Sequence, residues 1–259
     1  MEYNQGMNFM LVISLVLGWL AGWLVNILAD VLPNGRKLSR PVCPKCQKKF
    51  NWGEYLFFRN CTKCGKRRSL RTLIVQVVMT CVPVLLWFFP GQSLPFPLAL
   101  VLVIYLAVVL VIDLERRLIL HPVSITGAVL GLGIGIFLRG QESISYGITS
   151  TLLGGAAGFG VMLLFYYIGE LFVKQMSKKG GMPADEVALG FGDVNLSGIL
   201  GLILGWKAIF ACLFFAVLGG GLVSLAIILG MLIARKYKAF TAIPYAPFLI
   251  LSALFFLFL

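Results

Sequence analysis

The sequence predicts an all-α integral membrane protein with about eight transmembrane helices and a small polar insert between the first two. Hydrophobic residues make up 59% of the 259-residue chain and charged residues 12%, a composition typical of membrane proteins rather than of soluble ones. The apolar residues gather in eight stretches, and several reach the roughly 20 residues that a helix needs to cross a bilayer. These stretches cover 8–32, 72–90, 95–112, 122–138, 147–173, 192–205, 207–234 and 243–259.

The first stretch is too long and too rich in tryptophan for a cleavable signal peptide, and no small-residue cleavage site follows it. We therefore expect residues 1–32 to form a permanent first transmembrane helix. Residues 33–71 form a basic insert that is too small to build a large core of its own. Residues 72–259 carry the other stretches, and we expect them to form a seven-helix membrane core.

The basic residues give the chain a net charge of +12 and are spread unevenly over the predicted loops. If the N-terminus lies outside and the eight stretches alternate, all but two of the 22 lysines and arginines fall on the inner side, the exceptions being Arg139 and Lys207. This positive-inside bias predicts a multi-pass membrane protein with its N-terminus outside. Topology thus explains the positive charge, with attraction to anionic lipid as a secondary effect, and we expect no nucleic-acid partner.

Four cysteines of the insert form two C-x2-C pairs separated by fourteen residues, namely Cys43, Cys46, Cys61 and Cys64. Four thiolates at this spacing close a tetrahedral zinc (Zn2+) site that is structural, because it leaves no open position for catalysis. The charge distribution places the insert in the cytosol, where disulfides are disfavoured. We therefore expect zinc to fold the insert; the alternative is a pair of redox or incidental thiols. Cys81 and Cys212 lie in apolar stretches and are expected to be small buried hydrophobic residues.

Two aspartates stand where an apolar stretch meets a charged loop. Asp113 directly follows the apolar run 108–112, and Asp193 opens the sixth stretch within Gly190-Phe191-Gly192-Asp193. A charge beside a membrane segment is costly, so such residues are candidates for function. Both aspartates lie at cytosolic helix ends in the predicted topology. If they meet, one protonated carboxyl can polarise a peptide carbonyl while the other takes a proton from water, which is the chemistry of an aspartyl protease.

The same patterns also allow less specific roles for the acidic residues. The two aspartates can be separately solvated, with Asp193 a favourable charge near a helix N-terminus. Asp30 is expected to cap its helix end or to pair with arginines of the insert, and Glu170 to pair with Lys174. A transporter that relays protons or binds a cation, and a scaffold whose zinc insert docks a partner, are the alternative functions. Acidic residues cluster at the ends of the stretches, which disfavours the transporter.

Five segments of the chain together suggest a family. In chain order they are residues 22–33, the two cysteine pairs, Asp113-Leu114 with 119–122, Gly190-Phe191-Gly192-Asp193, and 243–248 with the sequence Ile-Pro-Tyr-Ala-Pro-Phe. In these segments, and in their order, the chain resembles the bacterial type IV prepilin peptidases, which are membrane aspartyl proteases of the Gly-x-Gly-Asp type. The resemblance covers nearly the whole chain.

The resemblance implies an eight-span protein of the inner (plasma) membrane that removes the short leader peptide from prepilin or pseudopilin precursors at the cytosolic face. Asp113 and Asp193 would be the catalytic pair, supported by Gly190 and Gly192, with no metal in the chemistry. Many members also methylate the new N-terminus with S-adenosylmethionine, and this activity stays open here. The resemblance does not indicate which precursor is cut or the oligomeric state.

The chain departs from the family pattern at four places. The stretch between the cysteine pairs is short, and Gln76 stands where an acidic residue is common. The position after the Pro122 turn lacks a frequent acidic residue, and Asn195 takes a place often held by lysine. The first two departures bear on methylation more than on proteolysis. His121, the single histidine of the chain, is expected to be a turn residue rather than a catalytic one.

Overall fold

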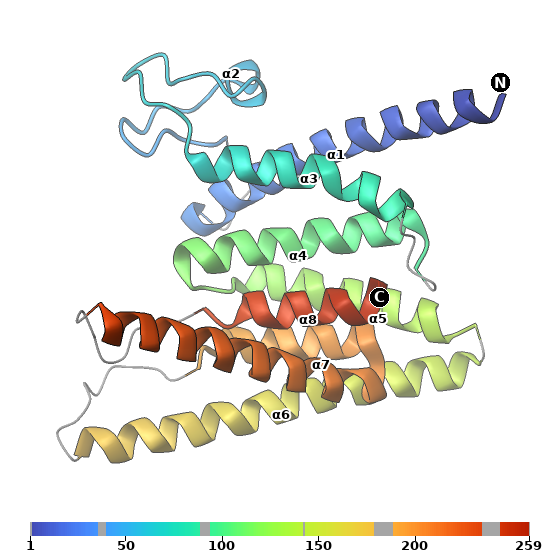
Figure 1. Cartoon of the computed structure of the whole chain (residues 1–259), viewed down its shortest axis with the longest axis vertical. Helices are drawn as coiled ribbons and strands as arrows, with labels where there is room; N and C mark the ends of the chain where they lie inside the picture. Colours follow the sequence, from blue (N-terminus) through green and yellow to red (C-terminus); the bar gives the residue numbers. More distant parts are fainter. Residues whose placement is uncertain are drawn as a thin grey trace. The chain divides into compact units, whose positions relative to one another are not determined.

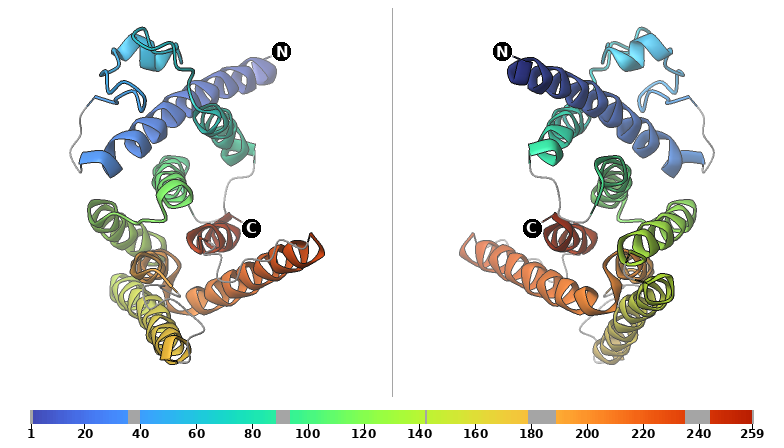
Figure 2. Two further views of the ribbon diagram at one scale, coloured as in Figure 1. Left: turned by 90° about the vertical axis from the view of Figure 1, so that its left-hand side faces the viewer. Right: turned by 90° about the vertical axis from the view of Figure 1, so that its right-hand side faces the viewer.

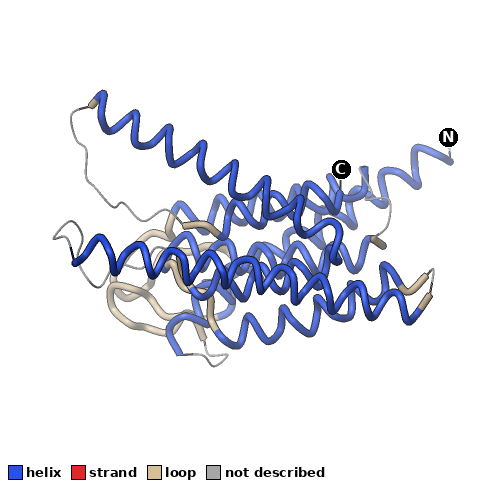
Figure 3. Tube along the Cα trace, turned by 90° about the horizontal axis from the view of Figure 1, so that it is seen from below, coloured by secondary structure: helices blue, strands red, loops and turns tan. Residues whose placement is uncertain are grey.

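The computed structural model describes residues 2–35, 40–88, 94–141, 143–178, 189–234 and 244–258. These residues form helices joined by loops (Figure 3), and the one β-type pairing among them is an isolated bridge between Val42 and Lys49. The helices are α1 (Glu2–Gly35), α2 (Trp52–Leu56), α3 (Leu70–Phe88), α4 (Phe96–Arg116), α5 (His121–Arg139), α6 (Ile144–Lys178), α7 (Phe191–Ile233) and α8 (Ala246–Phe258). The predicted all-α fold is confirmed.

Six of these described helices are long and apolar enough to cross a membrane, namely α1, α3, α4, α5, α6 and α7, while α8 is apolar but shorter. The sixth and seventh predicted stretches both lie on α7, which bends at Gly205. Gly205 has φ 79° and ψ 173°, outside the helical range and in a region that favours glycine. Figure 1 shows α7 reversing its direction at this point. The eight apolar stretches therefore correspond to seven helices, one of which is bent.

The chain divides into two compact units, Met1–Ile112 and Asp113–Leu259, and the boundary falls inside α4. Part of the predicted orientation depends on basic residues that lie outside the described residues, including Arg36, Lys37, Lys236 and Lys238. The orientation therefore stays a prediction.

In the first unit, α3 packs closely against α1. A Cβ atom at Gly18 would lie 2.6 Å from the carbonyl oxygen of Thr80, so only glycine allows the two backbones to approach so closely. Polar side chains add contacts between the two helices. The Asn26 amide donates to the carbonyl oxygen of Thr72 at 3.2 Å, and the Gln76 amide donates to that of Trp19 at 2.8 Å. Lipid is as apolar as the helices, so the hydrophobic effect does little to drive helices together in a membrane, and hydrogen bonds of this kind stabilise their packing.

The insert of the first unit is attached to α1 through Asp30. The hydroxyl of Tyr55 donates to Asp30 at 2.6 Å, and the guanidinium of Arg71 forms an ion pair with the same carboxylate. Around Tyr55, which is fully buried, lie Phe50 of the insert and Ile27 of α1, together with the cysteines. The predicted pairing of Asp30 with an arginine of the insert is confirmed. The prediction for Cys81 is wrong, because its side chain is exposed on α3.

In the second unit, α5 and α6 pack beside the first half of α7 (Figure 2). Glycines make the contact between α6 and α7 close: a Cβ at Gly201 would lie 2.1 Å from the carbonyl oxygen of Gly154. The guanidinium of Arg139, at the end of α5, donates to the carbonyl oxygens of Leu202 and Ile203 at 2.7 and 2.9 Å. These carbonyls belong to the last turn before the bend, where a helix leaves such groups without internal partners. Arg139 thus supplies the hydrogen bonds that cap the end of the first half of α7.

The last helix, α8, packs against the second half of α7. The hydroxyl of Ser252 donates to the carbonyl oxygen of Cys212 at 2.8 Å, and the Cys212 thiol lies 3.9 Å from the carbonyl oxygen of Leu249. The predicted burial of Cys212 is confirmed. The predicted pair of Glu170 and Lys174 on α6 is also confirmed, with 2.7 Å between the charged atoms.

Candidate active site and metal site

Asp113 lies in the last turn of α4 and is 5% exposed. Its Oδ2 atom is buried and accepts no hydrogen bond from the residues that the structure describes. The backbone turns sharply after it, because Arg117 has φ 51° and donates its N–H to the carbonyl oxygen of Asp113 at 2.7 Å. The charged side chain of Arg117 also interacts electrostatically with the Asp113 carboxylate. An unpaired buried carboxylate oxygen is costly, so its presence at this position indicates a function rather than a packing role.

Asp193 is the third residue of α7 and is 9% exposed. Gly190 precedes the helix in an extended conformation, and its carbonyl oxygen accepts the N–H of Asp193 at 3.0 Å. A Cβ at Gly190 would lie 3.3 Å from the Asp193 carboxylate, and one at Gly192 would lie 2.8 Å from the Cβ of Ile119. The two glycines of the motif therefore leave room for the carboxylate on one side and for the loop before α5 on the other.

The structure brings Asp113 and Asp193 together within the second unit. The two carboxyl groups interact electrostatically with one another, although they come from positions 80 residues apart in the sequence. Both are largely buried, so the interaction is screened less than it would be in water. Because the charge of one carboxyl disfavours ionisation of the other, one can stay protonated as an acid while the other is ionised as a base.

A groove of about 470 Å3 lies between α5, α6 and the first half of α7. Phe191 and Asn195, which flank Asp193 in the sequence, line it together with His121 and Ser124 of α5. Further along α7 its walls are mainly apolar and extend to Leu202. The groove thus has polar groups near the start of α7 and apolar walls further along it, and neither aspartate lines it.

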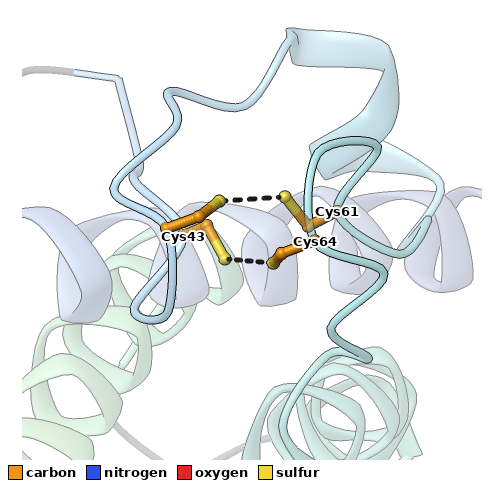
Figure 4. Close-up of side chains that lie close together, drawn as sticks. Cys43, Cys61 and Cys64 are labelled. Carbon is orange, nitrogen blue, oxygen red and sulfur yellow. Dashed lines mark hydrogen bonds between the residues drawn. The ribbon is translucent and has the colours of Figure 1, made fainter.

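The four cysteines of the insert come together in the first unit. Their sulfur atoms all lie within 4.8 Å of one another. The sulfur of Cys43 lies 3.6 Å from that of Cys64, and the sulfur of Cys46 lies 3.5 Å from that of Cys61. Figure 4 labels Cys43, Cys61 and Cys64 and draws these contacts as dashed lines. A disulfide needs a sulfur–sulfur distance of about 2.05 Å, so these are free thiols.

The arrangement of the sulfurs fits a tetrahedral metal ion. With zinc–sulfur bonds of about 2.3 Å, the sulfurs of a tetrahedral site lie roughly 3.8 Å apart, close to the two distances above. The backbone N–H groups of Cys64 and Lys63 point at the Cys61 sulfur and lower the pKa of its thiol to about 6. Such a thiol is ready to bind a metal as the thiolate. The cluster can therefore hold a metal ion, as the spacing predicted.

Two groups of the second unit have no role in the sequence-based prediction. Tyr245, directly before α8, has a buried hydroxyl without a hydrogen-bond partner among the described residues. Arg139 contributes to that prediction only through the charge distribution, yet it binds the carbonyl groups at the bend of α7. His121, predicted to be a turn residue, is the first residue of α5 and lines the groove.

Comparison with known proteins agrees with this geometry. Residues 100–225, which include both aspartates, match the sequence model of the Type IV leader peptidase family. Three proteins called prepilin leader peptidase/N-methyltransferase are similar to this chain. The protein from Myxococcus xanthus is 27% identical to it, that from Pectobacterium carotovorum 28% and that from Bacillus subtilis 29%. These alignments cover 76%, 82% and 80% of this chain. They cover 57%, 72% and 77% of the respective relatives, so the chain spans little more than half of the Myxococcus protein.

No solved structure matches the chain. The family match includes the two aspartates, and the longer alignments with the relatives extend over most of the chain. These findings confirm the resemblance predicted from the sequence: the chain is similar to the type IV leader peptidases.

Proposed function

We propose that the protein is an aspartyl endopeptidase that removes the leader peptide from type IV prepilin or pseudopilin precursors. The observation that carries the proposal is the pair of buried carboxyl groups, Asp113 and Asp193, which interact with one another between the end of α4 and the start of α7. The names of the relatives, prepilin leader peptidase/N-methyltransferase, support the same activity.

The proposed reaction begins with one carboxyl protonated and the other ionised. The ionised carboxyl takes a proton from a water molecule, whose oxygen bonds to the carbon of the scissile peptide carbonyl. The carbonyl oxygen receives the electron pair of its double bond and a proton from the other carboxyl. When the carbon–nitrogen bond breaks, the nitrogen takes the proton that came from water. The carboxyl that was protonated at the start then recovers a proton from the new carboxyl group of the product. One water is consumed and both aspartates return to their starting states.

The substrate of this reaction has an apolar helix that follows a polar leader. The groove suits such a chain, because it has polar groups near the start of α7 and its apolar walls continue along α7 to Leu202. From Phe191 to Leu202 the helix rises by about 16 Å, roughly half the thickness of the hydrocarbon core. The scissile bond would lie at the membrane boundary, where water and an unfolded backbone are both available.

The proposal includes the location of the protein. The charge distribution supports an inner-membrane protein whose N-terminus lies outside and whose aspartates lie at the cytosolic face. The membrane part would comprise residues 1–32 and 72–259, with residues 33–71 as the zinc-binding insert between them. Zinc, held by Cys43, Cys46, Cys61 and Cys64, would fold the insert and take no part in the cleavage.

Replacement of either aspartate by asparagine tests the function. Asp113→Asn and Asp193→Asn keep the size of the side chain and remove its ability to hold a charge or give up a proton. We expect both to abolish cleavage of a co-expressed pilin-like precursor in membranes, measured by its size on a gel. Glu170→Gln is the matched control, because Glu170 is an acidic residue of the same unit that pairs with Lys174 at the surface. Undiminished processing by both aspartate variants would remove the proposal.

The same assay addresses the other activity in the names of the relatives. With S-adenosylmethionine present, the mass of the cleaved product shows whether its new N-terminus carries a methyl group. A methylated product would extend the proposal to N-methylation, and an unmethylated product from active enzyme would restrict it to proteolysis. An aspartate-dependent transport activity without cleavage would instead favour the transporter.

A further inference from the structure

Tyr245 has an unexplained hydroxyl group. The residue lies directly before α8, within the segment 243–248 that contributes to the family resemblance but has no assigned role. Its ring is partly buried, and its hydroxyl is fully buried without a hydrogen-bond partner among the described residues. Buried hydroxyl groups almost always have a partner, because burial without one is costly. The Tyr245 hydroxyl is therefore available to a partner that the described residues do not supply.

The packing of α8 holds Tyr245 at the level of the aspartates. The hydrogen bond from Ser252 to the Cys212 carbonyl attaches α8 to the second half of α7. The ring of Tyr245 lies over Gly220, where a Cβ would be 3.3 Å from its edge. Measured along the helix axis, Gly220 lies about 22 Å after the bend at Gly205, and Asp193 lies about 18 Å before it. Figure 1 shows that α7 reverses its direction, so these two lengths of helix place both positions at a similar depth.

Tyr245 also interacts electrostatically with Asp193. The phenol of tyrosine ordinarily ionises near pH 10, so Tyr245 keeps its proton near neutral pH and acts there as a neutral hydrogen-bond donor or acceptor. The charge of Asp193 acts on this group, but the Tyr245 hydroxyl makes no hydrogen bond to it, so the hydroxyl stays available to another partner.

We propose that the Tyr245 hydroxyl is a third catalytic group, which donates a hydrogen bond to the oxygen of the scissile carbonyl. This inference rests on the proposed function. As water adds to the carbonyl carbon, the oxygen gains negative charge before the protonated carboxyl delivers its proton. A neutral donor aimed at that oxygen stabilises the charge most when it is greatest, and it does so in a site where water is largely excluded. Tyr245 transfers no proton, so the balance of the reaction is unchanged.

Tyr245→Phe is the direct test, because it removes one oxygen atom and keeps the ring over Gly220. We expect kcat for a purified precursor, with the full-length enzyme in lipid nanodiscs, to fall by roughly 10²-fold to 10³-fold while KM changes little. Tyr105→Phe is the matched control. The Tyr105 hydroxyl is likewise buried without a partner among the described residues, but burial alone accounts for its environment and no aspartate acts on it. We expect that variant to keep its kcat.

A second measurement separates catalysis from folding and binding. In an Asp113→Asn background, where no turnover occurs, adding Tyr245→Phe should leave the dissociation constant of the precursor unchanged within about two-fold, because the hydrogen bond forms fully only in the transition state. A Tyr245→Phe protein with the kcat of the parent would overturn the role of Tyr245. A Tyr245→Phe change that weakens precursor binding in the inactive background as much as it lowers kcat in the active enzyme would overturn it too. If both aspartate variants cleave normally, it is instead the proposed function that fails.

Discussion

Replacing Gly201 by alanine tests the close approach of α6 and α7, which positions the half-helix that carries Asp193. The new Cβ would lie 2.1 Å from the carbonyl oxygen and 2.7 Å from the carbonyl carbon of Gly154, where ordinary contact begins at 3.4 Å. Both atoms belong to the backbone, so no side-chain rotation relieves the clash, and the helices must separate by roughly 1 Å. Overpacking of this kind costs about 1–3 kcal/mol, and the better helix propensity of alanine returns up to about 1 kcal/mol.

We therefore expect Gly201→Ala to lower the free energy of unfolding by about 1–2 kcal/mol and to slow precursor cleavage. Gly160→Ala is the matched control on α6, because a Cβ there meets nothing within 4 Å, and this variant should be as stable as the parent or slightly more stable. Thermal unfolding in detergent, followed by tryptophan fluorescence, compares the two. A Gly201→Ala protein as stable as Gly160→Ala would refute the close contact of α6 with α7.

Three further predictions concern other contacts. Cys61→Ser, or treatment with a strong chelator, should remove about one zinc per chain and unfold the insert, seen by metal analysis and by faster proteolysis between residues 40 and 69; a metal-free parent protein would contradict the zinc site. Asp30→Asn should weaken the attachment of the insert to α1 by about 1–3 kcal/mol, because Tyr55 and Arg71 both bind that carboxylate, and unchanged proteolysis of the insert would argue against it. Arg139→Leu leaves the carbonyls of Leu202 and Ile203 unpaired and should destabilise the protein by about 2–4 kcal/mol, with a smaller loss for Arg139→Lys; equal melting temperatures for the two variants would contradict the cap at the bend.

The helices of the fold could be predicted well from the sequence, because a long apolar stretch has few alternatives in a membrane. The bend in α7 could not be predicted in detail. Its two stretches are separated in the sequence only by a short interruption, and the bend depends on Arg139 from another helix, which binds the freed carbonyls. The burial of single apolar residues could not be predicted either. Cys81 and Cys212 have similar apolar surroundings in the sequence, yet one is exposed and the other buried, because hydropathy does not distinguish lipid from protein interior.

The candidate site could be predicted as residues but not as a geometry. Asp113 and Asp193 stand out in the sequence because a carboxylate at the end of an apolar stretch is rare and costly. Their interaction required the fold, since it joins the end of α4 to the start of α7. The cysteines were more predictable, because each pair is local and its spacing already matches a metal site. Tyr245 lies in the segment 243–248 that resembles the family, but its role could not be predicted from the sequence, because its free hydroxyl becomes apparent only when α8 packs on α7.

The account depends above all on Asp113 and Asp193 acting as one unit, and a double-mutant cycle measures this directly. Cleavage rates of a saturating precursor are compared for the parent protein, Asp113→Asn, Asp193→Asn and the double variant. Groups that act together show strongly non-additive losses, so each single variant should lose nearly as much activity as the double variant. A double variant that loses the product of two independent factors, or a single variant that keeps the parental rate, would contradict a shared catalytic pair.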